Sequence, residues 1–158
     1  MNIYKNFLSK EIFKKLKDAV MSDYFPWYFN EEVNLRQKDS SFQFTFTFIE
    51  NGKEECWGEW LDVMKPVLKN IKHKKMNRVK ANLLTRTHKV IEHKYHTDQK
   101  EGTTGILYLN KCNGYTIFEN GKKVSSEENK YVEFNSNLKH TGSSCTDEQR
   151  RVVINFNY

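Results

Sequence analysis

The amino-acid sequence predicts a mainly β fold of the α+β class, in which N-terminal helices support a small β-barrel or sandwich. Two observations lead to this prediction: apolar residues recur at helical spacing in the first half of the chain, and short apolar runs separated by turn residues follow Arg78. Many short, evenly spaced strands are typical of sandwiches and barrels. The 158 residues suit one domain, so residues 1–77 should form a helical support layer with one strand and residues 78–158 a barrel.

Two helices are predicted from the spacing of apolar side chains. The first covers roughly residues 10–22, with Ser9 placed to cap it and Glu11 in its first turn. The second, Trp57–Ile71, has one apolar stripe made of Trp57, Trp60, Leu61, Met64, Val67, Leu68 and Ile71. A stripe at this spacing is more typical of core packing than of a groove for a cofactor or partner, so we assign it to the core.

The strands are predicted from alternation and from turn residues. In Phe42–Ile49 phenylalanines alternate with polar residues, so one aromatic face should be buried. Further strands are predicted at Val79–Thr85, Lys94–Asp98, Gly105–Asn110, Tyr115–Glu119, Lys130–Phe134 and Arg151–Asn157. Asn113 with Gly114 and Asn120 with Gly121 accept positive φ and favour tight hairpins.

The chain is basic, with a formal net charge of +6. This charge is compatible with nucleic acid, an acidic membrane surface or an anionic small molecule, and charge alone does not choose among them. Much of the excess lies between Lys65 and Lys80. The run from Lys72 to Lys75 follows the second predicted helix, where cations complement the helix dipole, so we interpret it as a solvated face.

The cysteines and the N-terminus indicate a cytoplasmic protein. Cys56, Cys112 and Cys145 are odd in number and widely separated, as expected of free thiols in a reducing compartment. Residues 1–16 carry charges every few positions and lack the apolar run of a signal peptide. No segment approaches the roughly 20 apolar residues of a membrane span, so we expect no membrane partner.

A metal site is indicated by His96, Asp98 and His140. On a strand, a His-x-Asp unit would place both side chains on one face. Alone it is a weak signal, because about half of such chains should contain one by chance, and a hydrogen-bonded surface pair is the alternative. His140, after the predicted strand Lys130–Phe134, completes the two-His, one-carboxylate set of non-haem iron oxygenases, which leaves three coordination positions open. His88 and His93 are interpreted as exposed loop residues.

These residues give the chain a resemblance to a known family. Over about residues 78–158, and more weakly at the first helix, it resembles the 2-oxoglutarate and Fe(II)-dependent oxygenases of the prolyl hydroxylase type. Their pattern is His-x-Asp, a distal His, and an Arg shortly beyond it; here Arg150 and Arg151 follow His140. The resemblance implies a double-stranded β-helix, a jelly-roll or cupin-like barrel with the metal at its mouth and helices packed on one sheet.

The resemblance also implies roles for single residues. His96, Asp98 and His140 would hold Fe(II), and an arginine would grip the distal carboxylate of the co-substrate 2-oxoglutarate by a two-point charged hydrogen bond. Both Arg150 and Arg151 fit the spacing of the family arginine. We choose Arg151, because it shares a strand face with Val153 and Asn155 while Val152, Ile154 and Phe156 turn toward the helices.

Two further residues are assigned to 2-oxoglutarate by the same resemblance. The stretch Ile106–Asn110 resembles the family strand whose tyrosine contacts the distal carboxylate, which gives this role to Tyr108. Asn155 would reach the same end of the co-substrate. The segments Asn113–Gly121 and Tyr131–Phe134 match the family hairpin and the strand before the distal His in order and spacing.

The activity implied is oxidative decarboxylation of 2-oxoglutarate by O2 to succinate and CO2, coupled to hydroxylation of a protein side chain or a small molecule, with ascorbate as a stimulant. One alternative is a nucleic-acid demethylase of the same chemistry, which is not favoured because no loop clusters Arg with aromatic residues. A second alternative is a jelly-roll binding module without turnover. The sequence names neither the substrate nor the oligomeric state.

Overall fold

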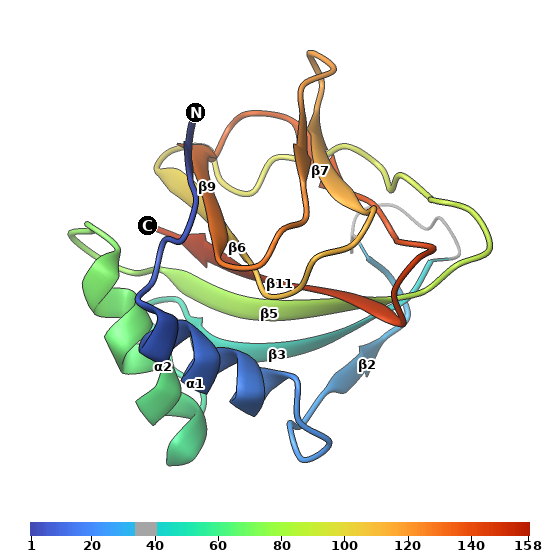
Figure 1. Cartoon of the computed structure of the whole chain (residues 1–158). Helices are drawn as coiled ribbons and strands as arrows, with labels where there is room; N and C mark the ends of the chain where they lie inside the picture. Colours follow the sequence, from blue (N-terminus) through green and yellow to red (C-terminus); the bar gives the residue numbers. More distant parts are fainter. Residues whose placement is uncertain (34–40) are drawn as a thin grey trace.

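Two facing sheets with two helices on the outer side of the larger sheet make up the fold (Figure 1). The structure, a computed structural model, describes residues 1–33 and 41–158. Its elements are β1 (Asn2–Tyr4), α1 (Lys10–Val20), β2 (Tyr28–Asn30), β3 (Gln43–Glu50), β4 (Lys53–Glu54), α2 (Glu59–Asn70), β5 (Arg78–Thr85), β6 (Thr103–Tyr108), β7 (Tyr115–Phe118), β8 (Lys123–Ser125), β9 (Lys130–Asn135), β10 (His140–Gly142) and β11 (Arg150–Asn157). No helix among these residues is long and apolar enough to cross a membrane.

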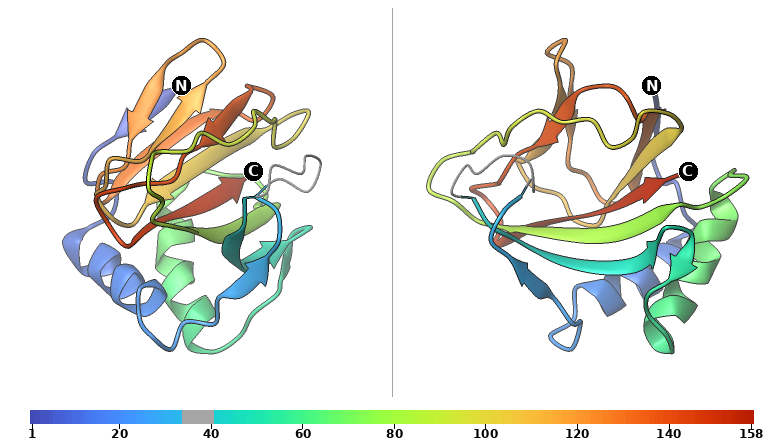
Figure 2. Two further views of the ribbon diagram at one scale, coloured as in Figure 1. Left: turned by 90° about the vertical axis from the view of Figure 1, so that its right-hand side faces the viewer. Right: turned by 180° about the vertical axis from the view of Figure 1, so that it is seen from behind.

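The strand order is that of a double-stranded β-helix. The larger sheet runs β1-β9-β6-β11-β5-β3-β2, with β4 paired to β3, and the smaller runs β10-β7-β8. The described strands pair in antiparallel fashion throughout. The rotated views show the smaller sheet above the inner face of the larger one (Figure 2). The predicted fold class, a mainly β jelly roll with helices packed on one sheet, is confirmed.

Both helices form where apolar spacing predicts them, with differences at their ends. The Ser9 hydroxyl caps α1 by accepting a hydrogen bond from the backbone N–H of Ile12. Helix α2 begins at Glu59, and Trp57 lies before it with 83% of its surface exposed, so assigning Trp57 to the core was wrong. The stripe that does face the sheet is Leu61, Met64 and Val67, and Ile71 is buried just after the helix.

The larger sheet is covered on both faces, and this creates two apolar clusters. The outer cluster joins α1 and α2 to the outward side chains of β3, β5 and β11, including Val152, Ile154 and Phe156, as predicted. The inner cluster lies between the sheets and includes Val153. Because neighbouring residues of a strand point to opposite faces, β11 contributes to both clusters.

Several strand predictions need correction. Lys94–Asp98 is not a strand: within it only His96 forms a bridge, to His140. The neighbouring bridge, Glu92 to Ser143, lies four residues away on one segment and three on the other, so the register shifts between the two bridges and no continuous ladder forms. Asn120 with Gly121 makes the predicted β7–β8 hairpin, whereas Asn113 with Gly114 connects β6 to β7 in the other sheet. In β3, Phe46 and Phe48 are buried, but Phe42 precedes the strand and is exposed.

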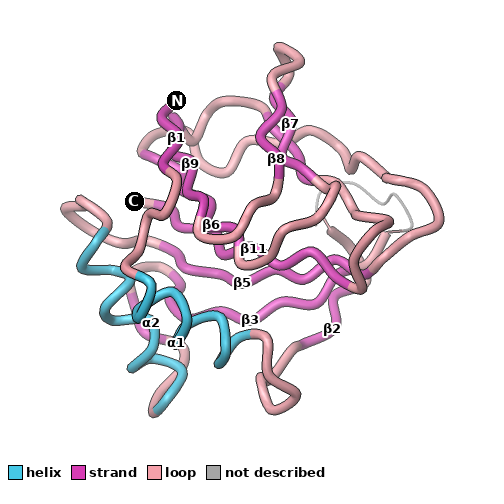
Figure 3. Tube along the Cα trace, in the orientation of Figure 1, coloured by secondary structure: helices cyan, strands magenta, loops and turns pink. Residues whose placement is uncertain are grey.

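The first 77 residues contribute more to the barrel than a helical layer with one strand. They contain β1, β2, β3 and β4, of which β1 pairs with β9 and β3 pairs with β5 (Figure 3). Strand β3 is the one that was predicted, whereas β1, β2 and β4 are only two or three residues long, too short for their periodicity to identify them. The three cysteines are free, as predicted, and the structure adds that all three are buried.

Candidate active site

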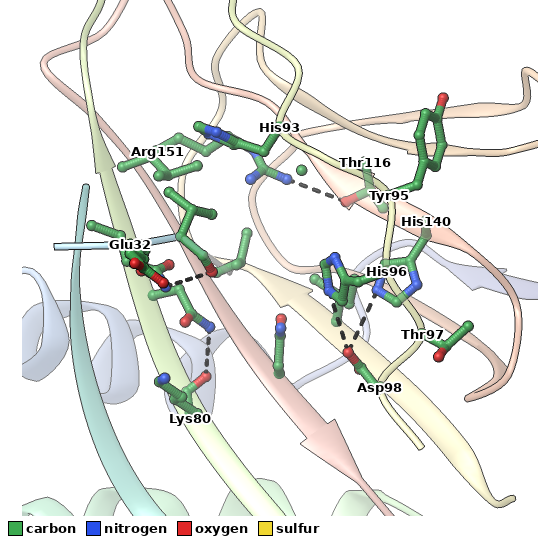
Figure 4. Close-up of a pocket in the computed structure, with 18 of the residues that line it drawn as sticks. Glu32, Lys80, His93, Tyr95, His96, Thr97, Asp98, Thr116, His140 and Arg151 are labelled. Atoms are coloured by element: carbon green, nitrogen blue, oxygen red, sulfur yellow. Dashed lines mark hydrogen bonds and ion pairs between the residues drawn. The ribbon is translucent and has the colours of Figure 1, made fainter. Parts of the chain in front are cut away.

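Two imidazoles and one carboxylate converge at one side of the space between the sheets (Figure 4). The Nε2 atoms of His96 and His140 lie 3.4 Å and 3.9 Å from Oδ1 of Asp98. One donor atom from each residue lies within 4.8 Å of the others. The structure therefore brings together the three residues that the sequence predicts as metal ligands.

Backbone and ring hydrogen bonds orient the two histidines. His96 and His140 exchange backbone N–H to O hydrogen bonds of 3.0 Å in both directions, which places the two residues side by side. The His140 Nδ1 lies 2.9 Å from the carbonyl oxygen of Leu138, and the His96 Nδ1 lies 3.4 Å from that of Lys94. With the proton on Nδ1, each ring would donate to its carbonyl oxygen and keep Nε2, beside Asp98, free to coordinate a metal, as in metal-binding histidines.

Asp98 is held by residues from two strands of the larger sheet. Its Oδ2 accepts hydrogen bonds of 2.9 Å from the Thr104 hydroxyl and from Nδ2 of Asn157, which leaves Oδ1 facing the histidines. Burial raises the pKa of the Asp98 carboxyl, but its hydrogen bonds and the neighbouring histidines outweigh burial and hold that pKa well below its usual range. Asp98 is thus a carboxylate at neutral pH.

The donor set fits a divalent transition metal. Burial lowers the pKa of His140, partly opposed by the charge of Asp98, so its imidazole is neutral at neutral pH and can coordinate a metal. Two imidazole nitrogens and one carboxylate oxygen form the ligand set that suits Fe(II), and each ligand has the supporting hydrogen bond that metal sites use.

Arg151 is a buried cation in the same cavity. Only 3% of its surface is exposed, and its Nε and Nη2 donate to the hydroxyls of Ser126 (2.8 Å) and Thr116 (3.2 Å). Within residues 1–33 and 41–158 it forms no ion pair with a carboxylate. Burial lowers its pKa, yet a guanidinium stays charged at neutral pH, so its remaining N–H groups face the cavity as an anion site.

Tyr108 packs against Arg151, whose Cζ lies 5.6 Å from the centre of the Tyr108 ring. Its side chain is fully buried, and its hydroxyl donates to Oγ1 of Thr116 at 2.8 Å. Thr116 lines the cavity and accepts from both Tyr108 and Arg151, so its own hydroxyl proton is the one left to donate to a ligand. Asn155 also lines the cavity, and its buried Oδ1 has no hydrogen-bond partner among the described residues.

The cavity has a volume of about 510 Å³, within the range of small-molecule sites. His93 lines it and is buried, so the prediction of an exposed loop position was wrong, whereas His88 is exposed as expected. Arg150 points away from the cavity and donates to the carbonyl oxygen of Met21 at 2.7 Å, so it is a half-buried contact to the end of α1 and not a free surface charge.

Comparisons with known proteins agree with this fold. No protein-family model matches the chain, and no curated protein matches it in sequence. A prolyl hydroxylase from Trichoplax adhaerens, solved with a peptide fragment of the hypoxia inducible factor oxygen degradation domain, is similar in structure: 16% identity, 99% of this chain, 82% of that chain, TM-score 0.69. The chain has the fold of the prolyl hydroxylase-like 2-oxoglutarate oxygenases.

Two bacterial structures extend this fold similarity. A Pseudomonas putida prolyl-4-hydroxylase shares 12% identity over 99% of this chain and 91% of that chain, with a TM-score of 0.60. A 2OG-Fe(II) oxygenase family oxidoreductase from Burkholderia pseudomallei shares 6% identity over 97% of this chain and 81% of that chain, with a TM-score of 0.68. The shared feature is the architecture, and the residues that give this chain its chemistry are those described above.

Proposed function

We propose that this protein is an Fe(II)- and 2-oxoglutarate-dependent dioxygenase that hydroxylates a protein side chain or a small molecule. One observation carries the proposal: His96, Asp98 and His140 converge in a cavity that also contains the buried guanidinium of Arg151. A metal-binding set and an anion-binding cation are the two sites that this co-substrate chemistry requires. The fold of the solved oxygenases supports the same reaction class.

His96, Asp98 and His140 would hold the iron. Bound Fe(II) would supply the activation of O2 that couples oxidative decarboxylation of 2-oxoglutarate, to succinate and CO2, with hydroxylation of a substrate C–H bond. The His140 imidazole enters this role neutral, and Asp98 enters it as a carboxylate that Thr104 and Asn157 hold in place. The protein thus supplies ligands that need little rearrangement.

Arg151 would bind the distal carboxylate of 2-oxoglutarate. Its N–H groups that do not contact Ser126 or Thr116 can form a two-point hydrogen bond with that carboxylate. Thr116 would add its hydroxyl proton, while Tyr108 would act by holding Thr116. Asn155 would contact the co-substrate through the buried carbonyl or amide of its side chain.

A peptide is one substrate that the fold can accommodate, since the Trichoplax adhaerens enzyme was solved with a peptide bound. The volume of the cavity also suits a small molecule beside 2-oxoglutarate. Nucleic acid is not favoured, for no described segment near the cavity combines arginines with exposed stacking aromatic residues.

The proposal is tested by incubating the protein with Fe(II), ascorbate and 2-oxoglutarate under air and measuring succinate. His96→Ala should abolish Fe(II) binding. Arg151→Ala should still bind Fe(II). It should weaken the binding of 2-oxoglutarate by about 3 kcal/mol, roughly a hundredfold in Kd, because a charge-assisted two-point contact is lost. Candidate peptides and metabolites are then screened by product mass spectrometry for an added oxygen.

Arg150→Ala is the matched control, since Arg150 is the neighbouring arginine but donates to the end of α1. It should leave the affinity for 2-oxoglutarate unchanged. If Arg150→Ala were the damaging change, the assignment of Arg151 would be wrong. A wild-type protein that binds neither Fe(II) nor 2-oxoglutarate would instead be a jelly-roll binding module.

A further inference from the structure

The inner face of the larger sheet is divided into an apolar half and a polar half. Under the smaller sheet, β9, β6 and β11 present apolar side chains to the inner cluster. Beyond β11, the inward residues of β5 are Arg78, Lys80, Asn82 and Leu84, which pair in register with the inward residues of β11. Polar side chains on the inner surface of a jelly roll lose contact with bulk water, and this costs free energy unless they gain other hydrogen-bond partners.

Arg78 and Lys80 are the charged members of this polar half. They lie two residues apart on β5, about 6.5 Å along the strand, and therefore share one face. The residues between and after them, Val79 and Ala81, point the other way into the helix-side core. Both Arg78 and Lys80 line the cavity that contains the candidate metal ligands, and the Lys80 side chain is visible there in Figure 4.

The described protein provides no counter-charge in contact with either cation. The Nε of Arg78 is buried and has no hydrogen-bond partner in residues 1–33 and 41–158. Neither Arg78 nor Lys80 forms an ion pair within those residues, although Glu32 lines the same cavity. By contrast, Lys139, which also lines the cavity, pairs with Glu119 at 3.0 Å.

The electrostatics of the pair favour an anion. Burial, and then the positive charge of Arg78, lower the pKa of Lys80, and only the carboxylate of Glu50 opposes this shift. Two half-buried like charges two residues apart repel each other. An anion placed between them would relieve that repulsion and would also supply an acceptor for the Arg78 Nε–H.

The location of the pair separates it from Arg151. Arg78 pairs in register with Asn157, whose side chain donates to the metal-ligand candidate Asp98. Arg151 pairs with Leu84, four residues or about 13 Å further along β5 than Lys80. An anion held by Arg78 and Lys80 would thus lie near the metal ligands, while the distal carboxylate of 2-oxoglutarate occupies Arg151.

We propose that Arg78 and Lys80 form a second anion site that binds a carboxylate of the substrate. This inference rests on the proposed function and narrows its substrate class to molecules that carry a carboxylate near the hydroxylated carbon. The guanidinium edge suits the two oxygens of a carboxylate, and Lys80 adds a point charge. An acidic side chain within a peptide and a free acidic amino acid offer the same group.

The test measures carboxylate binding while Arg151 is already occupied. The protein is loaded with Fe(II) and saturating 2-oxoglutarate under anaerobic conditions, and two probes are titrated by calorimetry: free aspartate, and the blocked tripeptide Ala-Asp-Ala. The blocked tripeptide Ala-Asn-Ala is the uncharged comparison. At least one aspartate probe should bind, and should bind at least tenfold more tightly than the uncharged tripeptide. The probe that binds identifies the source of the carboxylate.

Variants then assign the binding to these two residues. Lys80→Met and Arg78→Met should each lower the affinity for the aspartate probe at least tenfold and leave the affinity for 2-oxoglutarate unchanged. Lys65→Met, on α2, is the control and should change neither affinity. Lys80→Met should also unfold at the same or a higher temperature, because it removes a repelled, half-buried charge. If a Met variant does not fold, Lys80→Gln and Arg78→Gln are measured in its place.

Three outcomes would overturn the inference. In the first, the Lys80 and Arg78 variants bind the aspartate probe as tightly as the wild type. In the second, the aspartate probe binds no more tightly than the asparagine tripeptide. In the third, the Lys80 and Arg78 variants lose as much affinity for 2-oxoglutarate as Arg151→Ala does. The last outcome would assign Arg78 and Lys80 to the co-substrate. A protein that fails to bind Fe(II) and 2-oxoglutarate would refute the proposed function alone, since the same probe titrations without 2-oxoglutarate still decide the second anion site.

Discussion

Thr104 shows how one hydroxyl can determine the geometry of a metal site. It donates to Oδ2 of Asp98 and lies 3.0 Å from the Ser136 hydroxyl, so the carboxylate cannot rotate without losing a contact. We expect Thr104→Val, which keeps the side-chain shape, to weaken Fe(II) binding by about tenfold to a hundredfold, as observed when ligand-supporting hydrogen bonds are removed. The measurement is a metal titration of the variant and the wild type.

Thr103→Val is the control, because Thr103 precedes Thr104 on β6 and points to the opposite face. It should bind Fe(II) like the wild type. Equal metal affinity in all three proteins would show that the contacts of Asp98 with Asn157 and the histidines suffice without Thr104.

Gly114 provides the space that Arg151 occupies. A Cβ at position 114 would lie 2.6 Å from Cδ of Arg151 and 2.8 Å from the backbone oxygen of Ser144, too close for either to remain in place. Gly114→Ala should therefore displace the guanidinium and weaken the binding of 2-oxoglutarate by about 1 to 3 kcal/mol. Isothermal titration with 2-oxoglutarate measures this.

A second glycine separates backbone strain from loss of the site. Gly121, in the β7–β8 turn, has φ +83°, and a Cβ at this position would meet nothing within 4 Å, so Gly121→Ala should cost about 1 kcal/mol of stability through φ alone. Its affinity for 2-oxoglutarate should not change. If both alanine variants lost 2-oxoglutarate equally, crowding against Arg151 would not be the cause.

At this scale the sequence predicts some site residues and not others. His96, Asp98, His140 and Arg151 belong to a spaced pattern, and the structure brings them to one cavity. Their supporting residues do not form a pattern: Asn157 reaches Asp98 from 59 positions away, and Thr116 reaches Arg151 from 35. Contacts set by the pairing of distant strands leave no local signal in one sequence.

Strand β5 shows what alternation can and cannot predict. Its apolar positions, Val79, Ala81 and Leu83, are buried against the helices, and the strand was predicted to within one residue at its start. The alternate positions, including Arg78 and Lys80, are equally polar whether they face water or line a cavity. The sequence therefore predicts a strand with one polar face, and only the opposing sheet shows that this face is internal.

Helix α1 is attached to the barrel through Asn129, in the connection from β8 to β9. Its Oδ1 accepts from the backbone N–H of Leu8 at 2.9 Å, its Nδ2 donates to the Leu8 carbonyl at 2.8 Å, and its φ is +54°. Asn129→Ala should lower the free energy of unfolding by about 2 to 4 kcal/mol, because two buried hydrogen bonds are lost and alanine disfavours positive φ. Urea denaturation measures the change.

Asn129→Gly isolates the hydrogen bonds, because glycine adopts positive φ without strain. It should be destabilised less than Asn129→Ala, but still below the wild type. A glycine variant as stable as the wild type would mean that the two contacts to Leu8 contribute nothing and that the backbone conformation alone accounts for the effect.

At the scale of the whole molecule, residues near both ends of the chain contact the same strand, β9. β1 lies at the edge of the larger sheet on β9, and the terminal Tyr158 follows β11 (Figure 1). Glu133 of β9 joins them: its Oε1 accepts from Nδ2 of Asn2 and from the Tyr4 hydroxyl, both at 2.9 Å, and its Oε2 accepts from the Tyr158 hydroxyl at 3.1 Å. One carboxylate thus links both ends of the chain.

This link should make the stability of the fold depend on pH. Burial raises the pKa of Glu133, but its hydrogen bonds outweigh burial and leave that pKa below its usual range. A carboxyl whose pKa is lowered by folding stabilises the folded state above its unfolded pKa, near 4.5, and loses this contribution as the pH falls through the folded value.

Glu133→Gln keeps an acceptor for Asn2 and Tyr4 but offers Tyr158 a donor, so at pH 7 the variant should be less stable than the wild type by about 1 kcal/mol. Urea midpoints measured from pH 7 down to about pH 3 should show the stabilities of Glu133→Gln and the wild type converging in acid. The control is Glu119→Gln, which breaks an exposed pair with Lys139 and should differ little in stability from the wild type at any pH. A difference for Glu133→Gln that persisted unchanged in acid would show that the ionised carboxylate does not hold the chain ends together.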